Sequence, residues 1–493
     1  MTTTSSRRAF LRQAAALAAT TGTGALPFAM NLAAMGAAAA SAGDYKALVC
    51  VFLHGGNDSA NMVLPTDAAS WQAYTTVRGT GASPIALMAP GTPAQAGAAA
   101  GSPAALGGVL PLQPGFNVSP ENASRSFALH PVLGGTQSLF AQGRLAVLAN
   151  VGPLVVPVTR AQIRAKARPL PAKLGSHNDQ QSTWQALAPE GAAAGWGGRL
   201  ADMLASSNAN ASFTSISVSG NAVFASGRDV SAFQVGNGGA VPIQGMGSAL
   251  FGSWAVPAAY RAVLTQGNAP DAQPNLIARE YAAIAKRNID QQAAFNSAYL
   301  AASVTPTTRY THPVTGVATT NPLTEQLRSV ARIIGARTGL GARRQVFFVS
   351  LGGFDTHDWQ NLAQADLMAR LDHALAYFDT AMGALGMRDQ VTLFTASEFG
   401  RTFATNGDGT DHGWGAHHLV LGGAVRGGEV HGRFPQVGLN HDDDGGSGSF
   451  IPQASVEQLG ATLGRWFGVG ETDLDLVFPN LRNFDSRDLG LMR

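Results

Sequence analysis

The sequence predicts an α/β fold, a three-layer α/β/α sandwich in which a mostly parallel central sheet lies between two layers of helices. Two observations favour this class. Short apolar runs of strand length alternate along the chain with longer segments of helical periodicity, as expected when helices connect parallel strands. The runs are almost continuously apolar, which is typical of strands that are covered on both faces.

The expected strands are short apolar runs, and they occupy residues 47–53, 145–150, 215–219, 345–351, 390–396 and 418–421. The expected helices carry apolar residues at helical spacing, and they occupy residues 275–301, 324–337, 360–385 and 455–467. Residues 66–128 are rich in Gly, Ala and Pro and poor in charge, which predicts an insertion with long loops near the site. The charge run within residues 436–452 predicts a flexible, solvated surface turn.

Residues 1–42 have the layout of a secretory signal. Arg7 and Arg8 precede Phe-Leu, a weakly apolar stretch follows, and Ala-Ser-Ala at 40–42 forms a small-residue cleavage pattern. The alternative is a membrane anchor, but Pro27 and Asn31 interrupt the stretch. We therefore expect a twin-arginine signal that is removed, leaving residues 43–493 as one exported, periplasmic domain without a stable membrane span. The export machinery is an expected partner.

Charge and cysteine content agree with this expectation. The net charge is +2, and the three arginines of the signal have no acidic partner there, so the remainder carries −1. A nearly neutral body argues against nucleic acid as a partner. Cys50 is the only cysteine and lies in an apolar run, which predicts a buried thiol without a disulfide. Such a chain can fold, and can take up a metal, in the reducing cytoplasm before export.

Polar, Gly-rich turns follow three of the expected strands. Asp58 follows the first, Asp355 and His357 follow the fourth, and Glu398 and Arg401 follow the fifth. Functional groups gather at the carboxyl ends of parallel strands, and carboxylates with imidazoles suit a divalent metal. Glu398 is expected as a ligand or general base, and Arg401 as a donor to an anionic group. The alternatives are a turn cap for Asp58 and a structural ion pair between Glu398 and Arg401.

Two further segments are rich in groups that suit catalysis or metal binding. Residues 406–418 contain three histidines and two aspartates, and Asp411, His412 and His417 are the candidate metal ligands there. Ser176 and His177 stand at the start of an expected helix, and both are candidate catalytic residues. Ser176 is expected to cap this helix, and a hydroxyl at a helix start is also a candidate nucleophile.

The quoted pieces VFLHGGNDSANMVLP, SHNDQQSTWQ, GGFDTHDWQ, SEFGRTFATNGDGTDHGWGAHH and GGAVRGGEVHGRFP together resemble the exported bacterial family called domain of unknown function 1501. The resemblance runs from about residue 45 to residue 467. It implies a fold similar to the alkaline phosphatase and sulfatase superfamily.

The resemblance also implies roles for individual residues. The implied metal ligands are Asp58, Asp355, His357, Glu398 and either His412 or His417, and the implied nucleophile is Ser176. The chain departs from the superfamily at Phe399, which stands where a second-site histidine is expected, so a two-metal centre is in doubt. It also has no cysteine near Ser176.

These observations lead to a ranked set of hypotheses. The first is a hydrolase of small phosphate or sulfate esters that depends on a divalent metal, namely zinc, manganese or calcium. The second is a non-catalytic binding or assembly component of the cell envelope. The third, a serine esterase, ranks last because the chain contains no Gly-x-Ser-x-Gly sequence.

Overall fold

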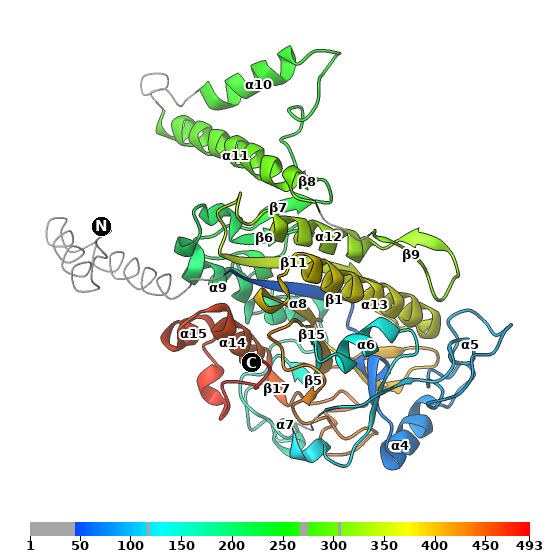
Figure 1. Ribbon diagram of the computed structural model, residues 1–493. Helices are drawn as coiled ribbons and strands as arrows, with labels where there is room; N and C mark the ends of the chain where they lie inside the picture. The colour runs from blue at the N-terminus through cyan, green and yellow to red at the C-terminus, as the bar shows by residue number, and fades with distance from the viewer. Residues whose placement is uncertain (1–44, 116–118, 267–274, 304–306) are drawn as a thin grey trace, which may run out of the picture.

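The computed structural model describes residues 45–115, 119–266, 275–303 and 307–493. The expected signal and its cleavage site, residues 1–42, lie outside the described residues. Figure 1 shows a body built around one large sheet and a pair of helices, α10 and α11, that project from it.

The central sheet has ten strands, and its main order is β16-β5-β15-β12-β1-β11-β6-β7-β8. All six expected strands are present, as β1 (Lys46–His54), β5 (Leu145–Gly152), β6 (Ser215–Ser217), β11 (Arg344–Gly352), β12 (Val391–Ala396) and β15 (Ala416–Leu421). Short strands complete the sheet, namely β7 (Phe233–Gly236), β8 (Gly239–Ala240), β16 (Val430–His431) and β17 (Ala454–Ser455). The central pairs are parallel, and β15 is antiparallel to both of its neighbours, so the sheet is mostly parallel as predicted.

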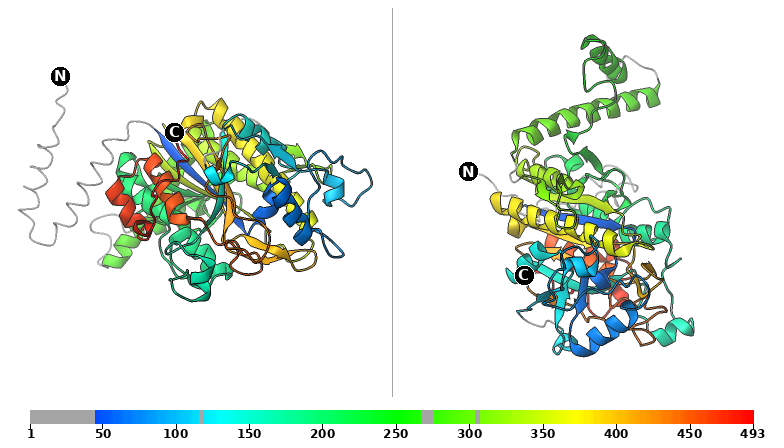
Figure 2. Two further views of the ribbon diagram at one scale, coloured as in Figure 1. Left: turned by 90° about the horizontal axis from the view of Figure 1, so that it is seen from below. Right: turned by 90° about the vertical axis from the view of Figure 1, so that its right-hand side faces the viewer.

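Helices cover both faces of the sheet, which confirms the expected α/β class. Alternate side chains of β1 enter two separate cores: Val49 and Val51 pack on one face, while Cys50 and Phe52 pack on the other. The first face is covered by α6 (Gly134–Ala141), α12 (Pro322–Gly335) and α13 (Gln360–Ala384). The second is covered by α8 (His177–Ala186), α9 (Trp196–Leu204), α14 (Val456–Phe467) and α15 (Glu471–Val477). In the left view of Figure 2, α13 in yellow and the C-terminal helices in red lie on opposite sides of the sheet.

Full burial explains the continuous apolar runs. The side chains of β1 from Ala47 to Leu53 have no exposed surface. Each large apolar side chain that is fully buried stabilises the fold by roughly 1.5–3 kcal/mol. Cys50 is one of the buried residues of β1, and its thiol is free, as expected.

The region 66–128 contains more regular structure than its composition suggested. It holds α4 (Ala68–Arg78), α5 (Pro103–Leu106), β3 (Leu110–Leu112) and β4 (Phe127–Leu129), and α3 (Ser59–Met62) and β2 (Val63–Pro65) precede it. Strands β2, β4 and β3 form a separate three-stranded antiparallel sheet. The remaining short elements are α7 (Arg160–Arg164) and two hairpins, β9 (Arg309–Thr311) with β10 (Ala318–Thr320) and β13 (Arg401–Thr405) with β14 (Thr410–His412).

The turn within residues 436–452 is only partly solvated, which corrects the prediction. Asp443 and Asp444 are buried. The Asp443 carboxylate accepts hydrogen bonds from Arg433 and from the backbone N–H of Gln436. Asp444 accepts from the backbone N–H groups of Asn440, Gly446 and Gly448. The carboxylates bind the loop to itself because they satisfy its inward-pointing backbone donors.

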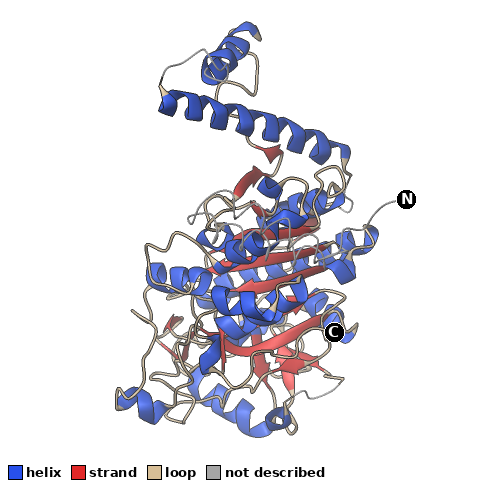
Figure 3. Ribbon diagram, turned by 90° about the vertical axis from the view of Figure 1, so that its left-hand side faces the viewer, coloured by secondary structure: helices blue, strands red, loops and turns tan. Residues whose placement is uncertain are grey.

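The helices α10 (Ala255–Thr265) and α11 (Leu276–Ala301) form what we call the arm. Figure 3 shows both helices extending beyond the edge of the sheet. The C-terminal part of α11 is anchored to the body by Phe295 and Tyr299, which are buried. Within the part of the chain that the structure describes, no helix has the length and apolar character needed to cross a membrane.

Candidate metal centre

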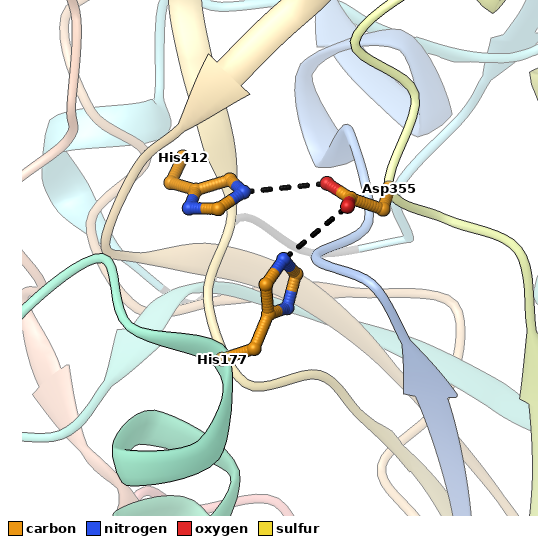
Figure 4. A group of neighbouring side chains, drawn as sticks. All are labelled: His177, Asp355 and His412. Carbon is orange, nitrogen blue, oxygen red and sulfur yellow. Dashed lines mark hydrogen bonds and ion pairs between the residues drawn. The ribbon is translucent and has the colours of Figure 1, made fainter.

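Three side chains from distant parts of the chain meet at the carboxyl ends of the strands. Asp355 follows β11, His177 begins α8, and His412 ends β14. One ligand atom from each lies within 4.8 Å of the other two (Figure 4). The Nε2 atoms of His177 and His412 lie 3.4 Å and 3.3 Å from different carboxylate oxygens of Asp355.

His357 adds a fourth group to this cluster. Its Nε2 lies 3.1 Å from Oδ1 of Asp355 and 3.0 Å from Nε2 of His412. His357 therefore contacts two members of the cluster, whereas the ligand atoms that all lie within 4.8 Å of one another belong to His177, Asp355 and His412.

Acceptors behind the rings fix the proton on the far nitrogen of each histidine. The Nδ1 atoms of His177, His357 and His412 lie 3.0 Å from Glu398 Oε1, 3.2 Å from Asp411 Oδ1 and 2.7 Å from the carbonyl oxygen of Gly175, respectively. A neutral imidazole that donates from Nδ1 keeps a lone pair on Nε2. All three lone pairs then face Asp355, and acceptors behind the ring are typical of metal-binding histidines.

The spacing of these atoms fits a bound cation. His177 Nε2 is buried and accepts no hydrogen bond from the described residues, although it lies 3.4 Å from Asp355 Oδ2. The facing Nε2 atoms of His357 and His412 cannot hydrogen-bond to each other while both rings are neutral. Tetrahedral zinc, with bonds of about 2.0–2.1 Å, separates its ligands by about 3.3 Å, close to the distances given above. Three nitrogens and one carboxylate suit zinc or manganese better than calcium, which prefers oxygen ligands.

Glu398 supports His177 and is not itself part of the cluster. It is fully buried, and its Oε1 accepts hydrogen bonds from Gly55 N–H and Gln181 Nε2 as well as from His177. Burial opposes ionisation of Glu398, but these hydrogen bonds outweigh it and hold its pKa below the ordinary value. The hydrogen bond to Glu398 raises the pKa of His177, against the effect of burial.

Arg401 holds Asp355 in place, which corrects its predicted role. The guanidinium is buried, and its Nη1 donates to Asp355 Oδ1 at 2.6 Å and to the carbonyl of Gly55 at 3.1 Å. Its Nη2 donates to the carbonyl of Thr410. Burial opposes ionisation of Asp355, but Arg401 lowers its pKa overall. Because these contacts direct the donors of Arg401 inward, the guanidinium does not face an incoming anion.

Asp58 is not brought to the cluster. Its two carboxylate oxygens accept from Nη1 and Nη2 of Arg78 at 2.6 Å and 3.0 Å, and both side chains are fully buried. Gln360 also donates to Asp58. The expected metal ligand is instead part of a buried ion pair beneath the site.

Two other expected site residues also point elsewhere. His417 lies on β15, where its Nδ1 accepts from the backbone N–H of Asn150 and its ring stacks on Phe434. Ser176 occupies the N-cap position of α8 as predicted, but its hydroxyl donates to Asp179 at 2.9 Å instead of accepting from the helix. That contact does not direct the hydroxyl toward the cluster as a nucleophile.

Sequence reasoning placed His177 among the catalytic groups and did not identify it as a ligand. The sequence marked His177 only by its position directly after a helix cap, and that position suits a catalytic group and a metal ligand equally. Asp411 was expected as a ligand, yet its carboxylate binds His357 Nδ1 and Asn406 from the outer side. Only the folded arrangement distinguishes a group that faces the centre from one that supports it.

Close packing determines the position of the surrounding loops. Phe399 is buried, with its ring 4.9 Å and 4.6 Å from the rings of His177 and His412. It forms an apolar wall where a second-site histidine was expected. Gly55 has a φ of 119°, and a Cβ there would lie 2.3 Å from the backbone nitrogen of Asp355. The turn after β1 thus needs glycine at position 55 so that it can approach the turn after β11.

A cleft of about 280 Å³ lies beside the cluster. His54, Asn178 and Gln181 line it, together with Glu190, Asn221 and other residues. Gln181 also donates a hydrogen bond to Glu398, and Glu398 in turn binds His177, so the cleft is connected to the cluster. Burial lowers the pKa of His54, although Glu398 opposes this effect. The lining is rich in amide groups that can bind a polar, uncharged molecule.

Comparisons with known proteins agree with the resemblance seen in the sequence. The profile of a family described as "Protein of unknown function (DUF1501)" matches residues 45–472. No curated protein matches the chain.

Solved structures that match do so at low identity. One is the crystal structure of Ps i-CgsB in complex with k-i-k-neocarrahexaose, with 10% identity and a TM-score of 0.32 over 89% of this chain and 77% of that one. Another is a 4S-sulf protein from work on the metabolism of multiple glycosaminoglycans by Bacteroides thetaiotaomicron. It has 8% identity and a TM-score of 0.32 over 87% of this chain and 74% of that one.

Proposed function

We propose that this chain, which belongs to the DUF1501 family, is a metal-dependent hydrolase of small phosphate or sulfate esters. One observation carries the proposal: the Nε2 atoms of His177 and His412 converge with the Asp355 carboxylate, while acceptors hold the proton on Nδ1 of both rings. A divalent cation held by these three residues, with His357 beside them, would supply Lewis acidity toward the ester and toward an attacking water.

The residues of the chain would prepare the site for this reaction. Glu398, Asp411 and the carbonyl of Gly175 keep the rings in the binding tautomer, and Arg401 holds Asp355 ionised. The cleft beside the cluster would receive the alcohol portion of the ester. Water would supply the oxygen that attacks phosphorus or sulfur, and the alcohol would leave with a proton.

A water nucleophile fits the geometry better than Ser176 does. The Ser176 hydroxyl donates a hydrogen bond to Asp179, and Asp179 also forms an ion pair with Lys173. Activation of Ser176 would require that contact to break. We therefore assign Ser176 to the start of α8, where it helps position His177.

The test is the metal content and the hydrolytic activity of the purified protein. We expect about one zinc or manganese ion per chain, since three protein ligands and a water complete a single catalytic site. His177→Ala and His412→Ala should each lose the metal, whereas His54→Ala, which alters the cleft alone, should keep it. Absence of bound metal after loading with zinc, manganese or calcium would refute the proposal.

Hydrolysis is measured separately with p-nitrophenyl phosphate and p-nitrophenyl sulfate on the metal-loaded protein. We expect release of p-nitrophenol that His412→Ala abolishes. Metal binding without hydrolysis of any ester in a broad panel would favour the alternative, a binding or assembly component of the cell envelope. The exposed apolar side chains on the arm favour that alternative, because such surfaces mark interaction sites.

The place of action is part of the proposal. Arg7, Arg8 and the Ala-Ser-Ala pattern at 40–42 support export by the twin-arginine pathway and action in the periplasm. Because this pathway carries folded proteins, the metal could be loaded before export. The metal assay therefore applies to the cytoplasmic precursor as well as to the exported protein.

A further inference from the structure

The outward side of α10 carries a regular apolar stripe. Val256, Tyr260 and Val263 are spaced i, i+4 and i+7, and 42%, 41% and 66% of their surface is exposed. This is the spacing at which one helix face packs against another helix. In the described part of the chain, much of each of these side chains stays open to solvent.

Helix α11 repeats the same pattern. Ile277, Tyr281 and Ile284 have the same i, i+4 and i+7 spacing, and 80%, 63% and 43% of their surface is exposed. The buried side chains of the arm are different ones, namely Pro257 on α10 and Ala282, Ala285, Ile289, Phe295 and Tyr299 on α11. The apolar stripes are therefore not needed to hold the arm together.

The two stripes lie on the same side of the arm. At 3.6 residues per turn, each stripe is rotated by about 100°, in the same sense, from the buried residues of its own helix. Helices α10 and α11 fold back on one another (Figure 1). An ion pair between Arg261 on α10 and Asp290 on α11 links them. Rotations of equal sign on two helices that run in opposite directions bring both stripes to one face.

The charged residues of the arm pair with one another. Arg261 and Lys286 both pair with Asp290, at 3.2 Å and 2.5 Å, and Arg287 lies 3.8 Å from Glu280. A membrane-binding helix would place its basic residues along the border of the apolar face, free to contact anionic lipids. Here three basic side chains are paired with acids instead, which favours a protein partner.

The exposed area fits a modest protein interface. The six side chains of the two stripes are 41–80% exposed and together offer about 500 Å² per copy. Two copies would bury about 1,000 Å², at the lower limit for a specific interface.

We propose that this face docks on the same face of a second copy of the chain, forming a symmetric four-helix interface. Two stripes at helical spacing need two helices to cover them, and a second arm supplies the same pair. A two-fold axis makes such a contact self-complementary and closed. The proposal does not depend on the metal centre or on catalysis.

The first test is the mass of the purified protein in solution, measured by light scattering and sedimentation. We expect a dimer. Val263→Glu and Ile277→Glu should each weaken dimerisation by about 30-fold or more, because a central apolar contact is replaced by a desolvated charge. Leu476→Glu is the matched control: Leu476 lies on α15 of the body with 65% of its surface exposed, and its replacement should leave the dimer intact.

The second test is cysteine cross-linking, which works well because Cys50 is buried. Tyr281→Cys should give disulfide-linked dimers under mild oxidation, and Leu476→Cys should not. A monomer at all concentrations, or a dimer unaffected by both glutamate variants, would overturn the proposal. So would a monomer whose arm binds phosphatidylglycerol vesicles and loses that binding in Ile277→Glu.

Discussion

The orientation of single rings decides what the candidate centre can bind. Each histidine of the cluster has an acceptor at Nδ1, and the acceptors come from a buried carboxylate, an exposed carboxylate and a backbone carbonyl. Residue types that the sequence grouped together therefore have different tasks. Asp355 faces the centre, whereas Glu398 and Asp411 stand behind the histidines.

The role of Glu398 can be tested by a change that keeps its shape. Glu398→Gln should weaken zinc affinity by about 10-fold, because the amide no longer supplies a negative charge behind His177. Competition with a chromophoric chelator measures this affinity.

Glu457→Gln is the matched control for that variant. Glu457 is also buried, and it binds Asn480 near the end of α15, so its substitution should leave the zinc affinity unchanged. Equal zinc affinity in Glu398→Gln and the wild type would contradict the assignment of Glu398 as a supporting residue.

At the scale of elements, the strand-end turns are positioned by backbone contact. The turn after β1 reaches the turn after β11 at Gly55, where the carbonyl of His54 also accepts from Phe354 N–H. On β15 the constraint is burial, because the side chains of His417 and His418 both lie inside the protein.

Gly55→Ala should destabilise the fold by about 2 kcal/mol or more and should displace Asp355. The added methyl group would overlap the backbone, and a residue with a side chain is strained at this φ. Denaturant unfolding and zinc affinity measure the two effects.

Gly352→Ala tests whether this result is specific to Gly55. Gly352 ends β11, and a Cβ there would meet open space. The control should keep both stability and zinc affinity. Equal behaviour of the two alanine variants would show that the close approach at Gly55 is unimportant.

Buried histidines should make the protein sensitive to acid. Burial lowers the pKa of His418 to about 3, so the folded state excludes a proton that the unfolded state binds below about pH 6.5. Stability from this residue is present above pH 6.5 and is lost as the pH falls toward 3, by about 1.4 kcal/mol per pH unit.

His418→Leu should therefore reduce the slope of unfolding free energy against pH between about 6 and 4. Leucine cannot take up a proton, and His418 packs against Trp184 in an apolar core. Urea unfolding at several pH values gives the slopes. Parallel curves for the wild type and the variant would contradict the assignment.

At the scale of the whole molecule, three parts have separate tasks: an expected export signal, a body with the candidate centre, and an arm with an exposed apolar face. The body and arm are joined through α11, whose buried Phe295 and Tyr299 fix it to the sheet region. Dimerisation through the arm would leave the carboxyl ends of the central strands accessible.

Export can be tested on the complete precursor. Arg7→Lys with Arg8→Lys should leave the protein in the cytoplasm of a bacterium that has the twin-arginine pathway, because the paired arginines identify the substrate. Fractionation and immunoblotting measure its distribution. Arg12→Lys is the control and should still be exported; equal export of all variants would exclude this pathway.

The sequence by itself determined the fold class, the six main strands, and four of the helices that cover the sheet (α8, α12, α13 and α14), because these depend on local periodicity and continuous burial. It also located Asp355, His357 and His412 at strand ends. It could not separate His412 from His417, five residues apart, because β14 and β15 direct them to different surroundings.

Only the tertiary structure showed that Arg78 forms an ion pair with Asp58, that Arg401 forms one with Asp355, and that His177 joins the cluster. The contact between His177 and Glu398 joins residues 221 positions apart, and local patterns contain no record of such pairings. The physical reason is that side-chain direction and pairing at a site depend on how strands and loops pack together, whereas secondary structure depends mainly on the periodicity of neighbouring residues.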